Sequence, residues 1–83
     1  MTYTEIYDTV ADMITEYLRL DPGELKPESH IVNDAGADSL AIVELGFKFS
    51  ETFGISMFNP TEDNLIIKNL VTTIEQELQQ AGQ

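Results

Sequence analysis

The residues that could carry chemistry in this 83-residue chain lie in one stretch, where Ser39 follows Gly36, Ala37 and Asp38. A serine in the first turn of a helix lies at the positive end of the helix dipole, so backbone N–H groups would partly neutralise a phosphate attached to its hydroxyl. A helix that begins after a glycine-containing loop also exposes its first residues to a modifying enzyme. By itself the pattern is weak, because Asp–Ser pairs often serve only as helix caps.

Catalysis by Ser39 is not expected. A serine nucleophile needs a base within hydrogen-bond reach and a third group that orients this base. The chain has one histidine, His30, which is expected to be an exposed loop residue, and it has no Gly-x-Ser-x-Gly motif. A calcium loop beginning at Asp34 would place Gly36 at a ligand position and Leu45 where a bidentate glutamate belongs. The sequence therefore predicts neither an enzyme nor a metal-binding protein.

The charge balance indicates which partners the chain can attract. Fifteen Asp and Glu against four Lys and Arg give a formal net charge of -11. Nucleic acid and anionic membranes are unfavourable partners for such a chain, whereas a protein with a basic patch would be attracted. The same acidity could also serve only to keep a small domain soluble. No apolar run could span a bilayer, the first residues do not resemble a secretory signal, and cysteine is absent, so we expect a cytoplasmic location.

The elements that would position Ser39 are helices, because apolar residues recur along the chain at three- and four-residue spacing. Thr2 and Glu5 can form a capping box, and Asp38 is a good N-cap for the helix that carries the serine. The predicted helices cover about residues 3–19, 38–53, 60–65 and 67–79. We therefore expect one domain over residues 1–83, an all-α, small four-helix bundle with three main helices and a short third one. No broad apolar stripe is left over, so a monomer is expected.

The second predicted helix has a core face and an outer face. The residues expected to supply the core face are Val43, Leu45, Gly46, Phe49 and Phe53. Leu40, Glu44 and Phe47 fall partly off this stripe, which would leave some apolar surface exposed near the start of the helix.

The GADSL sequence at residues 36–40, followed by Val43, Glu44 and Leu45, resembles the phosphopantetheine attachment motif of acyl carrier proteins. The likeness extends over essentially the whole chain, from the first amphipathic helix and the long loop to the short third helix and the closing helix. Motif, position, length and acidity are specific in combination, whereas the Asp-Ser-Leu tripeptide alone is not. The resemblance implies a non-catalytic carrier in fatty-acid, polyketide or other specialised lipid or secondary-metabolite biosynthesis.

The resemblance also implies roles for individual residues around the serine. A phosphopantetheinyl transferase (a holo-carrier synthase) would attach 4'-phosphopantetheine covalently to Ser39, and the thiol of this arm would hold acyl groups as thioesters. Asp38 would cap the helix and position the metal-bound substrate of the transferase, and Leu40 would be an apolar contact beside it. Phe47 would be a further apolar contact on the recognition surface. Glu44 and Glu51 would meet basic residues of the transferase and of acyl-transferring and chain-extending enzymes.

In proteins of this kind the acyl chain can slip between the helices, which shields the thioester from water. The residues that the resemblance implies as its lining are Val43, Leu45, Phe49, Met57, Leu65 and Leu70. Ordinary core packing is the alternative role for each of these lining residues, and ordinary helix surface is the alternative for the recognition residues.

Several positions depart from the usual pattern of the family. Ala35 stands in place of a leucine, Ala41 replaces a frequent acidic residue, Lys48 and Ser50 dilute the acidic second helix, and residues 58–60 give an unusual start to the third helix. These departures favour a dedicated carrier for a specialised pathway over a housekeeping fatty-acid carrier.

Two alternatives stay open beside the acyl carrier. A peptidyl or aminoacyl carrier has the same arm, but such modules usually have a Gly-Gly-x-Ser-Leu motif and are less acidic. Ala37 and Asp38 before Ser39 favour acyl cargo. The other alternative is an arm-less acidic protein-binding module that docks on a basic partner.

Overall fold

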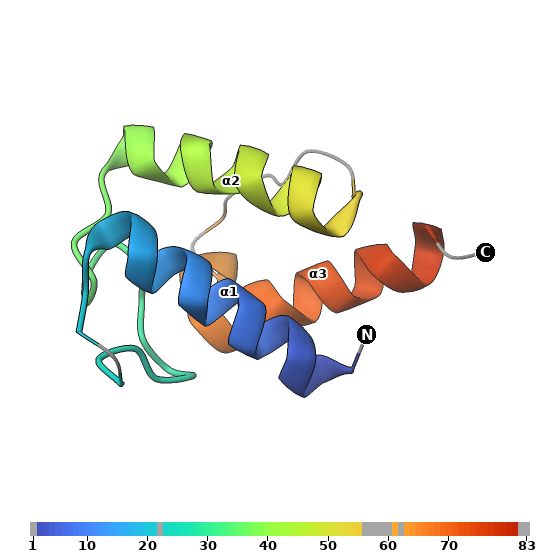
Figure 1. Cartoon of the computed structure of the whole chain (residues 1–83), viewed down its shortest axis with the longest axis horizontal. Helices are drawn as coiled ribbons and strands as arrows, with labels where there is room; N and C mark the ends of the chain where they lie inside the picture. Colours follow the sequence, from blue (N-terminus) through green and yellow to red (C-terminus); the bar gives the residue numbers. More distant parts are fainter. Residues whose placement is uncertain (1, 22, 56–60, 62, 82–83) are drawn as a thin grey trace.

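The computed structural model describes residues 2–21, 23–55, 61 and 63–81, and no strand occurs within these ranges. Its elements are α1 (Tyr3–Leu18), α2 (Ser39–Phe53), the 3-10 helix η1 (Asp63–Leu65) and α3 (Ile67–Ala81). Both α2 and α3 run in the direction opposite to α1, and α2 begins at the end of the bundle where α1 terminates (Figure 1). The predicted all-α bundle is confirmed.

The first helix has a well-defined start and end. The Thr2 hydroxyl accepts a hydrogen bond from the Glu5 N–H at 3.2 Å, and the Glu5 carboxylate accepts from the Thr2 N–H at 2.8 Å. The predicted capping box is therefore present. Arg19 adopts a left-handed conformation with φ of 57°, so α1 ends at Leu18 and not at residue 19.

The remaining helix boundaries are close to those expected. Because the N-cap Asp38 has an extended backbone with φ of -97°, α2 begins at Ser39. The predicted helix at residues 60–65 corresponds in part to η1, while its expected start at residues 59–60 lies outside the described residues. α3 continues to Ala81, beyond the expected end at residue 79, because glutamine and alanine at the two added positions both favour helix.

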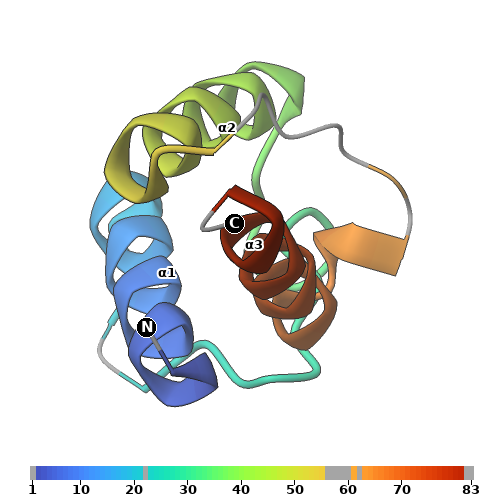
Figure 2. The same ribbon diagram turned by 90° about the vertical axis from the view of Figure 1, so that its right-hand side faces the viewer.

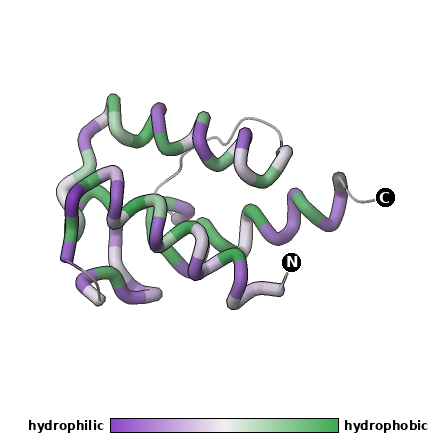
Figure 3. Tube along the Cα trace, viewed as in Figure 1, coloured by the Kyte–Doolittle hydropathy of each residue, from purple (hydrophilic) through white to green (hydrophobic). Residues whose placement is uncertain are grey.

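The core is formed by side chains from the three α-helices, the long loop and η1. Its buried residues are Ile6, Val10, Ile14, Ile31, Ala37, Ala41, Leu45, Phe49, Phe53, Leu65, Ile67, Leu70, Val71 and Ile74. The backbone of α1 closely approaches those of α3 and α2, and α3 also packs against η1. The three helices surround this core (Figure 2). Apolar residues recur among polar ones along each helix (Figure 3), and each helix is amphipathic and buries its apolar face.

The long loop between α1 and α2 is fastened to the segment where η1 meets α3. The Ile31 N–H donates to the Leu65 carbonyl at 2.9 Å, and an isolated antiparallel bridge pairs His30 with Ile66. The Ile31 side chain is buried in the core. These contacts fix the path of the loop shortly before it reaches the start of α2.

Candidate functional site

Ser39 is the first residue of α2, and it is exposed. Asp38 caps the helix, because its carboxylate accepts from the Ala41 N–H at 2.8 Å and its carbonyl accepts from the Ile42 N–H at 3.0 Å. The first N–H groups of a helix have no acceptor within it, so those of Ser39 and Leu40 lie at its open, positive end. The position is therefore compatible with an attached phosphate, which needs both solvent access and nearby N–H donors.

A hydrogen-bonded turn shortly before Asp38 depends on His30. The His30 Nδ1 atom accepts from the N–H groups of Val32 and Asn33, each at 3.1 Å. The backbone N–H of His30 donates to the Asp34 carboxylate at 2.7 Å. The expectation of an exposed loop residue was wrong, since His30 is half-buried and organises the turn. A lone histidine in a loop gives no sequence signal of this role, because the contact exists only once the loop has folded.

The turn also contains a glycine that its backbone requires. Gly36 has φ of 81°, in the left-handed region where a side chain is unfavourable. One residue later, the Ala37 N–H donates to the Ile31 carbonyl at 2.8 Å, which closes the turn. The glycine of the GADSL sequence thus helps to aim the chain into α2.

The outer face of α2 is unusually apolar. Leu40 is 65% exposed, Phe47 is 53% exposed, and Val43 between them is 48% exposed. The expectation that Val43 belongs to the core face was wrong, because it lies three residues after Leu40 and four before Phe47 and so shares their face. Glu44 and Glu51 are also exposed. All the residues expected to meet partners therefore lie on one accessible surface.

A side-chain contact joins this surface to α1. The Tyr17 hydroxyl donates a hydrogen bond to Oε2 of Glu44. This bond raises the pKa of Tyr17 above its ordinary value, with smaller contributions from desolvation and from the negative charges of Glu44 and Asp38. Sequence analysis missed the contact, because spacing rules relate residues within one helix and these two lie 27 residues apart on different helices.

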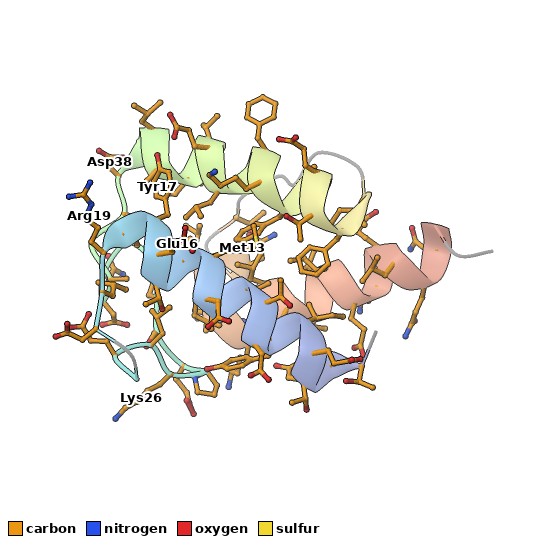
Figure 4. All side chains as sticks on the ribbon, viewed as in Figure 1. Met13, Glu16, Tyr17, Arg19, Lys26 and Asp38 are labelled. Atoms are coloured by element: carbon orange, nitrogen blue, oxygen red, sulfur yellow. The ribbon has the colours of Figure 1, made fainter. Side chains whose placement is uncertain are left out.

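A groove of about 550 Å³ lies beside this contact, between α1 and α2. Its lining residues are Met13, Glu16, Tyr17, Arg19, Lys48, Glu51 and Thr52. Figure 4 shows Tyr17 reaching from the last turn of α1 toward the first half of α2, close to Asp38. The groove therefore lies between the second half of α1 and the last turns of α2, and the α2 residues that line it are at the opposite end of that helix from Ser39.

The candidate residues for lining an acyl chain divide into distinct groups. Leu45, Phe49, Leu65 and Leu70 are all buried in the common core. Val43 lies on the outer surface of α2, and Met57 is outside the described residues. The closed packing of these buried side chains means that an acyl chain could enter only if the helices separate.

Neither a metal cluster nor a membrane-spanning helix is found among the described residues. Among the residues that the structure describes, no group of three His, Cys, Asp or Glu side chains is placed to hold a metal ion. No described helix is both long enough and apolar enough to cross a membrane.

Comparison with known proteins identifies the family. The family described as phosphopantetheine attachment site matches residues 8–59, a segment that contains Ser39 and all of α2. The acyl carrier protein of Campylobacter hominis is 42% identical over 72 residues, which cover 86% of this chain and 91% of that protein. This chain belongs to the acyl carrier protein family. Acyl carrier protein AcpXL of Rhizobium meliloti is 34% identical over an alignment of 88 residues, which covers 92% of this chain and 93% of that protein. The acyl carrier protein of Campylobacter curvus is 39% identical over 71 residues, covering 84% and 92%.

Membership of this family fixes the general activity. Acyl carrier proteins are carriers and not catalysts, and they hold covalently attached 4'-phosphopantetheine. The predicted family, cofactor and non-catalytic role are confirmed. Proteins of this family are handled by phosphopantetheinyl transferases and by enzymes that act on acyl groups.

Proposed function

We propose that Ser39 is the attachment residue and that the chain carries acyl groups as thioesters in a specialised biosynthetic pathway. The observation that carries the proposal is the exposure of Ser39 as the first residue of α2, within the segment that matches the attachment-site family. The serine hydroxyl is both accessible to a transferase and adjacent to the open N–H groups of the helix.

Attachment needs only one nucleophilic atom from this chain. A bond forms between the Ser39 Oγ and the phosphorus of coenzyme A that bears the pantetheine, the bond to adenosine 3',5'-bisphosphate breaks, and the hydroxyl proton passes to the transferase. Asp38 holds the first turn of α2 through the Ala41 N–H, and as the residue before Ser39 it would position the metal-bound substrate of the transferase. The N–H groups at the helix start stabilise the negative charge of the phosphodiester. When bound, the arm supplies the thiol that the cysteine-free chain lacks.

The exposed face of α2 is proposed as the surface that partner enzymes recognise. Leu40 and Phe47 offer apolar contacts, and such exposed apolar patches on a small protein commonly mark interaction sites. Glu44 and Glu51 lie on the same helix and would attract basic residues of the transferase and of acyl-transferring enzymes. A monomer is part of the proposal, since this patch would be reserved for other proteins.

The acyl chain is proposed to occupy the region of the core next to α2. Leu45, Phe49, Leu65 and Leu70 line this region, and each methylene removed from water would contribute about 0.8 kcal/mol. Met57 remains a candidate by the family resemblance alone. Val43, on the outer surface, would contact the chain only near its exit.

A specialised pathway is proposed because residues of α2 depart from the usual pattern of the family. Ala41 is buried where related carriers often have an acidic residue, and exposed Lys48 adds a positive charge beside the two glutamates. Partner enzymes that read a more acidic helix should therefore recognise this one less well. Fatty-acid synthase enzymes should process the acylated carrier more slowly than a housekeeping carrier, and equal rates across a panel of them would contradict this part of the proposal.

Intact mass spectrometry tests the attachment residue. Coexpression with a broad-specificity phosphopantetheinyl transferase should add the mass of one arm to the wild-type chain, and Ser39→Ala should abolish the gain. Ser50→Ala, on the same helix, is the matched control and should still gain the arm. A wild-type chain that never gains the mass would favour the arm-less binding module. An aminoacyl load on the chain purified from its source cell would favour the peptidyl carrier.

The site of action completes the proposal. We expect the carrier to work in the cytoplasm, where coenzyme A and the transferase that uses it are found. Detection of the arm-bearing form in another cell fraction alone would contradict this expectation.

A further inference from the structure

We propose that Tyr17 is a positioning residue for partner recognition: its hydroxyl holds the Glu44 carboxylate in a fixed place on the exposed face of α2. A basic side chain of a partner enzyme would then meet an acceptor that is already oriented. The inference rests on the proposed function, because it takes Glu44 to be a residue that partners contact.

The tyrosine is packed against the core and the glutamate lies at the surface. The Tyr17 ring packs against the buried core, whereas Glu44 is exposed. The hydroxyl donates to Oε2 of Glu44, so Oε1 keeps both lone pairs for a cation or N–H donor of a partner. The core thus restrains the orientation of a surface carboxylate through one hydrogen bond.

The contact lies in the middle of the proposed recognition surface. Glu44 is four residues after Leu40 and three before Phe47, so it shares a helix face with these two exposed apolar residues. The Tyr17 hydroxyl is close enough to Asp38 for the charge of this carboxylate to contribute to the raised pKa of Tyr17. The Tyr17–Glu44 pair therefore lies next to the surface that an enzyme would cover when it contacts Ser39 and Leu40.

The hydrogen bond from Tyr17 would also keep the Glu44 carboxylate from pairing with Lys48. Lys48 is four residues after Glu44, the spacing at which a glutamate and a lysine on one helix can pair. Among the described residues, Glu44 bonds to Tyr17 and forms no ion pair with Lys48. Loss of the Tyr17 hydroxyl would release the carboxylate toward Lys48, which would reduce its attraction for a partner's cation.

The variant Tyr17→Phe tests the proposal, because it keeps the packed ring and removes only the hydroxyl. The probe is a holo-carrier synthase with coenzyme A, and the steady-state transfer of the arm to Ser39 is measured. Immobilising a free side chain on binding has a cost, so KM should rise by about two- to fivefold, and by no more than on loss of the Glu44 charge itself. The kcat should not change, since Ser39 and its helix cap are untouched.

Tyr7→Phe is the matched control. Tyr7 is also a half-buried tyrosine of α1, but its raised pKa is due first to desolvation and then to the charge of Glu28, not to a residue of α2. The Tyr7→Phe variant should leave the KM of the holo-carrier synthase unchanged. Adding Lys48→Gln to Tyr17→Phe should recover part of the lost affinity, because the released carboxylate then has no lysine to pair with.

A double-variant cycle decides whether Tyr17 acts through Glu44. In a Glu44→Gln background, Tyr17→Phe should have no further effect on KM; an equal effect in both backgrounds overturns the proposal. NMR titration of the tyrosine ring carbons gives an independent signature. Glu44→Gln should lower the pKa of Tyr17 toward its ordinary value and leave that of Tyr7 in place, whereas an unmoved Tyr17 pKa contradicts the contact.

Failure of the proposed function and failure of the proposed role of Tyr17 would give different experimental results. A wild-type chain that accepts no arm overturns the proposed function and with it this inference. A wild-type chain that accepts the arm, with a Tyr17→Phe variant of equal or lower KM, overturns the role of Tyr17 alone.

Discussion

The outward faces of α1 and α2 are built from different residue types. On α1 the exposed positions include Asp8, Asp12 and Glu16, an ordinary solvated surface. On α2 the exposed positions include Leu40 and Phe47, whose large apolar side chains do not contribute to the core. The two helices thus bury similar apolar faces and differ on their outward faces, which is the difference expected if α2 is the proposed recognition surface.

The largest expected effect is on the free energy of unfolding, and it distinguishes the buried face of α2 from its exposed face. Phe49 is 1% exposed, so Phe49→Ala should lower the free energy of unfolding by about 3–5 kcal/mol. Phe47 is 53% exposed, so Phe47→Ala should change it by no more than about 0.5 kcal/mol. Urea unfolding followed by circular dichroism measures both. Equal losses of stability would show that Phe47 supports the fold and is not reserved for partners.

A smaller effect is expected on the KM of the holo-carrier synthase when single negative charges are removed from α1 or from α2. Glu44→Gln and Glu51→Gln should each raise the KM of the holo-carrier synthase by about two- to fivefold, the range of an exposed ion pair. Asp8→Asn and Asp12→Asn on α1 remove the same charge and should leave KM unchanged. Added salt should narrow the difference between wild type and the α2 variants. Equal effects on both helices would show that net charge alone attracts the synthase.

The smallest expected effect is on the pH dependence of stability, and it comes from the capping box at the start of α1. Hydrogen bonds from the backbone and then the side chain of Thr2 lower the pKa of Glu5 below its ordinary value. A carboxyl whose pKa is depressed in the folded state stabilises the fold above its unfolded pKa, and this contribution is lost as pH falls through the folded value. Wild type should therefore be slightly more stable than Glu5→Gln at neutral pH, and thermal unfolding should show the difference disappear in acid. A difference that grows toward low pH would contradict the capping box.

Local patterns in the sequence were sufficient to predict the helices and the cap of α2, because spacing and capping act over a few residues. Asp38 accepts from the Ala41 N–H as predicted. The exposure of Val43 was not predicted, since an apolar residue at the edge of a helical stripe can belong to either face until neighbouring helices are placed. The contacts of Tyr17 and His30 depend on how separate segments meet, so no local spacing could reveal them.

The most direct test of the central claim is to locate the arm on the chain. Wild-type protein treated with coenzyme A and a phosphopantetheinyl transferase is digested, and its peptides are fragmented in a mass spectrometer. The account predicts a single modified residue, Ser39, at the exposed start of α2. An arm on another serine, or a chain that remains unmodified, would contradict it.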